Sequence, residues 1–184
     1  MASSALAWSF TSRNEDAGLT GIVTLDNNGG KVRFGINSIA FPDAVLDGFY
    51  SMPQAPALAY AENIFVTNFW NPIQGYNQAS QLIASKVADL AFNAGVGEGV
   101  TLLQRGANAV WTAMPALATD GVCGALTVAR VNMIVGEQEE ELYEAVLAQG
   151  EAFYEELCAR KPTEFTPALE AEWIRRLDLR PPVG

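Results

Sequence analysis

The segment EDAGLTGIVTLDNNGGKVRFG, residues 15–35, changes the chain from helical to extended character. Before it, the apolar spacing over residues 3–17 is typical of a short helix. Residues 19–25 are then rich in β-branched side chains, and residues 26–30 (DNNGG) carry a dense turn signal. Residues 31–34 alternate polar and apolar side chains. The segment therefore predicts a β-hairpin that directly follows the first helix.

The rest of the chain is helical in character. A short helix is expected to open at Pro42, and the periodic segments predict longer helices over residues 59–69, 79–94, 98–108, 124–135, 137–159 and 167–177. Residues 79–94 are apolar on most sides, which indicates a buried central helix. The acidic segment 137–159 is interpreted as a solvated helix face. These patterns predict one α+β domain, mainly α, over residues 1–184.

Composition excludes several classes of function. The chain has no histidine, which removes Ser-His-Asp and Cys-His nucleophile systems and histidine-ligated zinc. Acid–base chemistry then falls to carboxylates, tyrosines or lysines. The net charge of −10 argues against nucleic-acid binding. Charged or amide residues interrupt every apolar run, so no membrane span is expected. Cys123 and Cys158 are interpreted as buried reduced thiols, with a disulfide as the alternative.

The N-terminal residues 1–16 lack the basic start and the apolar stretch of a signal peptide. We therefore expect synthesis in the cytoplasm. Any action outside the cell would need a separate export route, such as a phage holin or a secretion system.

Two carboxylates flank the predicted hairpin. Glu15 lies near the end of the first helix, and Asp26 lies at the hairpin turn. Glycosidic cleavage uses one protonated carboxyl as acid and a second group that stabilises the oxocarbenium ion or orients water. The alternatives are a solvated Glu15 and an Asp26 that only forms the turn. Asp16 is the rival acid, because successive helical residues point about 100° apart and only one can face a cleft.

The order of local motifs resembles the endolysin-type N-acetylmuramidases of glycoside hydrolase family 108. The resemblance runs in order along nearly the whole chain. The matching positions are Glu15, Asp26, Gly29-Gly30, Gly35-Ile36, Tyr60, Asn68–Pro72, Asp89–Gly95, Leu102–Arg105, Thr119–Thr127 and Trp173–Arg176.

The resemblance implies a lysozyme-like fold, with a catalytic part over residues 1–95. Residues 96–184 resemble the peptidoglycan-binding region of the family. The implied reaction is hydrolysis of the β-1,4 bond between N-acetylmuramic acid and N-acetylglucosamine in bacterial peptidoglycan. It needs no cofactor and no metal, and we expect a monomer. Glu15 is then the general acid and Asp26 the second catalytic group, with Asn93, Tyr60 and Trp70 as substrate contacts.

To act as an acid near neutral pH, Glu15 needs an apolar, partly desolvated pocket that keeps it protonated. Leu19, Val32 and Phe34 are its candidate walls. Other roles stay open for the predicted contacts. Asp89 and Asn93 share a helix face and either form a packing network or bind substrate. Tyr60, Trp70 and Trp173 are either core residues or platforms for sugar rings.

The chain departs from the family pattern near the site. Asp16-Ala17 replaces the glycines expected after the glutamate, and Val32 replaces a threonine whose counterpart in phage-type lysozymes helps to hold the attacking water. Because valine cannot hydrogen-bond water, the alternative is a catalytically weak or inactive protein of the same fold that binds the wall or belongs to a virion. A hydrolase of another amino-sugar polymer, such as chitin, is a further alternative.

Overall fold

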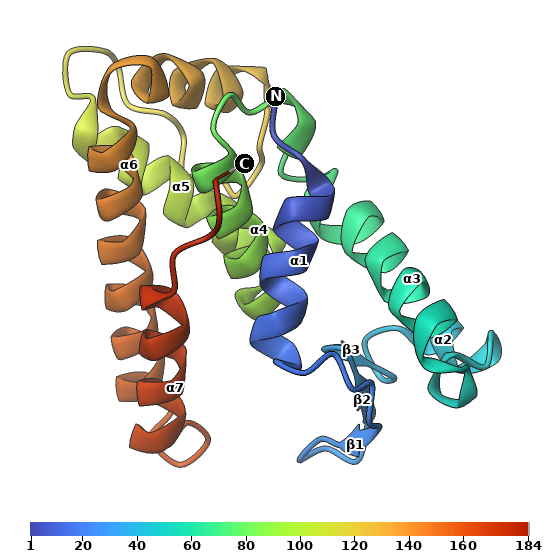
Figure 1. Cartoon of the computed structure of the whole chain (residues 1–184). Coiled ribbons are helices and arrows are strands. Elements are labelled where there is room, and N and C mark those ends of the chain that lie inside the picture. Colours follow the sequence, from blue (N-terminus) through green and yellow to red (C-terminus); the bar gives the residue numbers. More distant parts are fainter. Residues whose placement is uncertain (184) are drawn as a thin grey trace.

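The computed structural model describes residues 1–183 and is mainly helical, with a small antiparallel sheet near the N-terminus (Figure 1). The predicted fold class, α+β and mainly α, is confirmed. The elements are α1 (Ser4–Glu15), β1 (Thr24–Leu25), β2 (Lys31–Arg33), β3 (Ile36–Asn37), α2 (Pro42–Leu46), α3 (Gln54–Phe65), α4 (Gln81–Ala94), α5 (Val96–Val110), α6 (Ala125–Arg160) and α7 (Pro167–Asp178). Short 3-10 turns at Phe49–Ser51 and Gly75–Asn77 complete the fold, with a π-helical turn at Val66–Trp70.

The sheet has one strand more than the predicted hairpin. Its order is β1-β2-β3, with Thr24 opposite Val32 and Val32 opposite Asn37. The extra strand follows a tight turn in which Phe34 and Gly35 have φ angles of 49° and 76°. Directly opposed residues point to the same face of a sheet. Thr24, Val32 and Asn37 therefore share one face.

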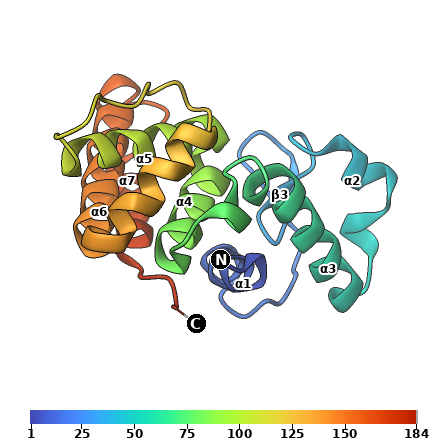
Figure 2. The same cartoon turned by 90° about the horizontal axis from the view of Figure 1, so that it is seen from above.

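Helices α1 and α4 lie side by side in the middle of the molecule (Figure 1). Helices α5, α6 and α7 lie on one side of this pair, and the sheet with α2 and α3 lies on the other (Figure 2). Every residue from Leu82 to Ala91 of α4 is buried, which confirms the prediction of a central helix. The sheet and α7 thus lie on opposite sides of the C-terminal end of α1.

Several predicted boundaries were wrong by a few residues. Helix α1 ends at Glu15, because Asp16 takes a non-helical φ of −146°. The helix predicted over residues 59–69 begins at Gln54 and loosens into the π-helical turn. The two helices predicted on either side of residue 136 are continuous in α6, which changes direction at Gln138 (φ −143°, ψ 48°; Figure 1).

Both cysteines, Cys123 and Cys158, are buried free thiols, as predicted. No helix within residues 1–183 has both the length and the apolar character that crossing a bilayer requires.

Candidate functional site

Glu15 is the last residue of α1 and packs against the turn between β2 and β3. A Cβ atom at position 35 would lie 2.7 Å from Glu15 Cγ and 2.6 Å from Phe92 Cε1. Gly35 also has a positive φ, which side chains rarely adopt. A glycine at this position therefore lets the sheet approach the aliphatic part of Glu15 closely.

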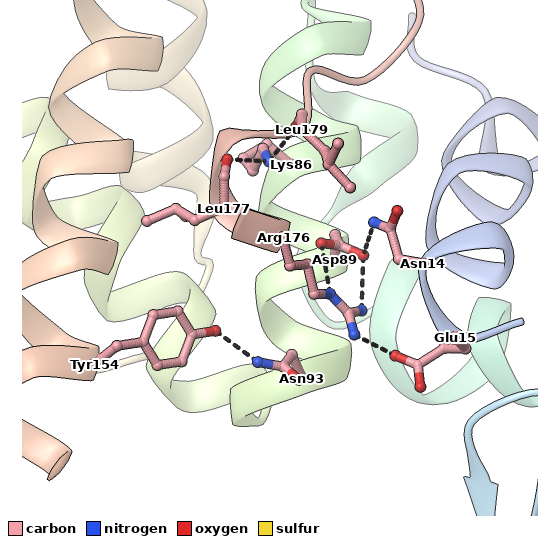
Figure 3. Close-up of polar contacts among 9 residues, drawn as sticks. All are labelled: Asn14, Glu15, Lys86, Asp89, Asn93, Tyr154, Arg176, Leu177 and Leu179. Carbon is pink, nitrogen blue, oxygen red and sulfur yellow. Dashed lines mark hydrogen bonds and ion pairs between the residues drawn. The ribbon is translucent and has the colours of Figure 1, made fainter. Parts of the chain in front are cut away.

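The carboxylate of Glu15 forms an ion pair with Arg176 of α7 (Figure 3). Arg176 also donates two hydrogen bonds to Asp89 of α4, from Nε at 3.1 Å and from Nη2 at 2.8 Å. Asn14 donates a further hydrogen bond to Asp89 at 3.1 Å. Burial alone lowers the pKa of Arg176, but the charges of Asp89 and Glu15 outweigh it and raise the pKa. The network joins α1, α4 and α7 around one guanidinium.

This environment corrects the expectation of an apolar pocket around Glu15. Phe34 and Val32 do lie near the acid, but Leu19 packs against the core instead. The dominant polar neighbour is the guanidinium of Arg176, which pairs with an ionised carboxylate. The side chain of Glu15 keeps 21% of its surface exposed.

Two grooves meet at Glu15, and within residues 1–183 it is the one residue that lines both. The sheet groove, of about 320 Å³, runs between the end of α1 and the sheet and is lined by Glu15, Asp16, Thr20, Ile22, Thr24, Val32, Phe34 and Gly35. The helix groove, of about 300 Å³, runs between α1 and α7. Its lining includes Asn93, Trp173 and Arg176, together with the exposed Arg13 and Arg175.

Asp16 is the carboxylate that shares the sheet groove with Glu15. It accepts hydrogen bonds from the backbone N–H of Gly21 at 2.7 Å and from the Thr20 hydroxyl at 3.0 Å. Burial raises the pKa of Asp16, but these hydrogen bonds outweigh burial and hold its pKa below the ordinary value. Asp16 is therefore ionised at neutral pH beside the candidate acid.

Asp26 lies in the exposed turn between β1 and β2 and lines neither groove. Its carboxylate accepts hydrogen bonds from the Asn27 backbone at 2.6 Å and from the Asn37 side chain at 2.7 Å. Since Asn37 shares a sheet face with Val32, Asp26 extends the wall opposite Glu15 toward solvent. The structure thus supports the turn-forming role of Asp26 and gives Asp16 the position beside Glu15.

Two of the three predicted substrate contacts lie away from the grooves. Trp70 is fully buried, with its ring packed against Gly75, so it belongs to the core. The hydroxyl of Tyr60 donates to Asp47 at 2.6 Å, and this bond raises the pKa of Tyr60 to about 12. Tyr60 is half-buried on α3, where its ring packs on Phe49.

Asn93, the third predicted substrate contact, lines the helix groove and donates to the Tyr154 hydroxyl at 2.7 Å (Figure 3). The aromatic ring at this groove is that of Trp173, which stacks on Tyr154 with ring centroids 5.2 Å apart. Asp89, by contrast, is 2% exposed, and its carboxylate is bonded to Arg176 within the protein. Of its two predicted roles, packing network or substrate binding, this position favours the packing network. No metal-binding group of three or more Cys, Asp or Glu residues occurs within residues 1–183.

Lys86 anchors the end of α7, and with it Arg176. Its ammonium is buried and donates to the carbonyl oxygens of Leu177 at 2.8 Å and Leu179 at 2.6 Å (Figure 3). Burial lowers the pKa of Lys86 to about 8, although the charge of Asp89 opposes the shift.

This lowered pKa of Lys86 makes the free energy of unfolding depend on pH. Between about pH 8 and the ordinary lysine value of 10.5, the unfolded chain binds a proton at residue 86 that the folded chain has released. Stability therefore rises with pH in this window. From pH 7 to pH 9 we expect the free energy of unfolding to rise by about 1 kcal/mol relative to Lys86→Met. Urea unfolding at both pH values measures this rise, with the exposed Lys31→Met as control. Parallel pH curves for wild type and Lys86→Met would contradict it.

Comparisons with known proteins support the fold but name no family. No protein-family model matches the chain, and no curated protein matches it. Among solved structures, the chain is similar to one described as the structure of Brucella abortus SagA, with a TM-score of 0.60 and 19% identity. The match covers 95% of this chain and 93% of that chain. At this identity the likeness shows a shared fold over nearly the whole length.

Proposed function

We propose that the protein is a peptidoglycan hydrolase that cleaves the β-1,4 bond between N-acetylmuramic acid and N-acetylglucosamine. The observation that carries the proposal is the position of Glu15 where the sheet groove meets the helix groove. A glycan that occupies both grooves would place an internal glycosidic bond beside this carboxyl. The ordered motif resemblance to family 108 muramidases supports the same reaction.

The proposed chemistry uses Glu15 as general acid. The protonated carboxyl gives its proton to the glycosidic oxygen, the bond from that oxygen to the anomeric carbon breaks, and water adds to the carbon. The proton that water loses passes to the Glu15 carboxylate, which restores the acid. Asp16 stays ionised beside Glu15 and stabilises the positive charge that develops on the sugar. Because Glu15 forms an ion pair with Arg176 in the free protein, the two side chains must separate before each cleavage.

Charge favours peptidoglycan over a neutral glycan such as chitin. The whole chain has 11 basic and 21 acidic residues. The helix groove nevertheless presents two exposed arginines, Arg13 and Arg175, against one exposed glutamate, Glu172. Peptidoglycan carries carboxylates on its stem peptides, which these guanidinium groups would attract.

The second candidate is a wall-binding protein of the same fold that has lost catalysis. The ion pair between Glu15 and Arg176 and the valine at position 32 favour it. The two candidates are separated by incubating the purified protein with purified sacculi. Release of soluble reducing sugar supports the hydrolase, whereas sedimentation with intact sacculi and no release supports the binding protein.

The role of the second carboxylate is tested by a pair of variants. We expect Asp16→Asn to lower turnover at least tenfold, because it removes a negative charge beside the developing cation. Asp26→Asn serves as the matched comparison and should lower turnover less, since Asp26 lines neither groove. The rate of reducing-sugar release at saturating substrate measures both variants. A larger loss in Asp26→Asn would return the second catalytic role to the hairpin turn.

Val32→Thr should increase turnover while the melting temperature stays the same. Val32 is half-exposed in the wall of the sheet groove, where a hydroxyl can bond to water. In a dry core the same hydroxyl would cost about 1–3 kcal/mol. Thermal unfolding and reducing-sugar release are measured on the same samples. Lost stability without a gain in turnover would mean that the hydroxyl meets no water at this position.

A further inference from the structure

A larger hollow lies away from Glu15, beneath the connection between α5 and α6. Residues 111–124, the yellow connection in Figure 1, and the first turns of α6 enclose about 610 Å³, roughly twice the volume of either groove at Glu15. We call it the loop pocket. Its lining residues are mostly apolar and include Met114, Leu117, Val122, Leu126 and Met133.

Large apolar side chains of the loop pocket are exposed to solvent. Leu126 is 81% exposed and Val122 is 64% exposed, while Met133 and Met114 are 43% and 41% exposed. Such an exposed apolar cluster is typical of a site where an apolar molecule binds. Methionine side chains are flexible and adapt readily to the shape of a bound ligand.

Arg130 places a buried positive charge in the lining of this pocket. It is 7% exposed, its Nη2 donates to the carbonyl of Pro115 at 3.0 Å, and its Nη1 has no hydrogen-bond partner among residues 1–183. Arg130 forms no salt bridge with any carboxylate of residues 1–183. Arg33, the other buried arginine of this kind, donates to three carbonyls. Burying a cation without a counter-ion lowers the stability of the fold, so an anion bound beside Arg130 would be stabilising.

The N-terminus of α6 lines the same pocket, and an anion would stabilise it too. Its N-cap, Gly124, supplies no side-chain hydrogen bond, and the first turn contains no acidic residue. The free N–H groups and the helix dipole favour a negative charge here. Asp120 also lines the pocket, but its carboxylate accepts from Gln104 at 2.9 Å and from the Val122 backbone at 3.0 Å.

We propose that the loop pocket binds a free fatty acid, with the carboxylate at Arg130 and the start of α6 and the alkyl chain along the methionine and leucine side chains. The deep burial of the guanidinium suits a small head group rather than a bulky phosphodiester. A peptide fits less well, because each of its amide groups would need a polar partner. Gln104, the main polar side chain of the lining, already bonds Asp120, Val122, Thr127 and Gly121.

Calorimetric titration of the full chain with dodecanoate, kept below its micelle concentration, tests the proposal. We expect saturable one-to-one binding, and binding of 1-dodecanol that is at least tenfold weaker, because the alcohol lacks the charge. Arg130→Met should weaken dodecanoate binding at least tenfold and leave dodecanol binding unchanged. Arg105→Met, which removes an exposed arginine outside the pocket, should change neither.

A second variant keeps the test decisive if Arg130→Met does not fold. Leu126→Glu alters a residue that is 81% exposed, so folding is preserved while a negative charge enters the pocket wall. We expect this variant to lose dodecanoate binding. The proposal is overturned if wild type does not bind dodecanoate or if dodecanol binds equally well. It is also overturned if the chain sediments with phosphatidylcholine vesicles but does not bind free dodecanoate.

Discussion

Glu15→Gln is expected to abolish wall lysis, with a fall in turnover of about 10²–10⁴-fold. The amide keeps the shape of the side chain but has no acidic proton to give to the glycosidic oxygen. Its carbonyl oxygen can still accept the hydrogen bond that Arg176 donates, and Arg176 keeps its two bonds to Asp89. We therefore expect the melting temperature to change little. Turnover is measured as reducing sugar released from purified sacculi.

Glu172→Gln is the matched control for this variant. Glu172 lines the helix groove but is exposed and does not line the sheet groove. It should keep nearly full turnover. If Glu15→Gln also kept full turnover, Glu15 would have no role as the acid, and the proposed mechanism would fail.

Arg176→Met is expected to give the largest loss of stability, about 3–5 kcal/mol. Methionine keeps the aliphatic part of the side chain but removes the charge that compensates two carboxylates. The Asp89 side chain is 3% exposed and would keep only the hydrogen bond from Asn14. An uncompensated carboxylate at such a site is destabilising, and α7 would lose its ion pairs with Glu15 of α1 and Asp89 of α4.

Urea unfolding measures this loss, with Arg175→Met as control because Arg175 is exposed at the preceding position. A double variant, Arg176→Met with Asp89→Leu, should recover part of the loss, because the Asp89 carboxylate is then no longer buried without Arg176. A loss below about 1 kcal/mol in Arg176→Met would show that the network contributes little to the fold.

The elements with a strong local signal could be predicted from the sequence. The apolar run of residues 79–94 identified α4 as the buried central helix, and DNNGG identified the first turn of the sheet. The third strand was missed because its turn depends on a left-handed Phe34 beside Gly35. Phenylalanine rarely adopts that conformation, so the sequence carries no signal for it.

The site could be predicted only in part, because its decisive contacts are long-range. Glu15 and Arg176 are 161 positions apart, and Asp89 and Arg176 are 87 apart. No local pattern showed that these groups meet. Trp70 and Trp173 have the same side-chain chemistry, and only the fold places Trp70 in the core and Trp173 at the helix groove.

Product analysis tests the central claim most directly. Purified sacculi are digested with the protein, the soluble fragments are reduced with borohydride, and their ends are identified by mass spectrometry. A muramidase with Glu15 as its acid leaves N-acetylmuramic acid at the reducing ends, so we expect muramitol-terminated fragments from wild type and none from Glu15→Gln. Glucosaminitol ends, anhydromuramic ends, or no soluble fragments from wild type would contradict the proposed function.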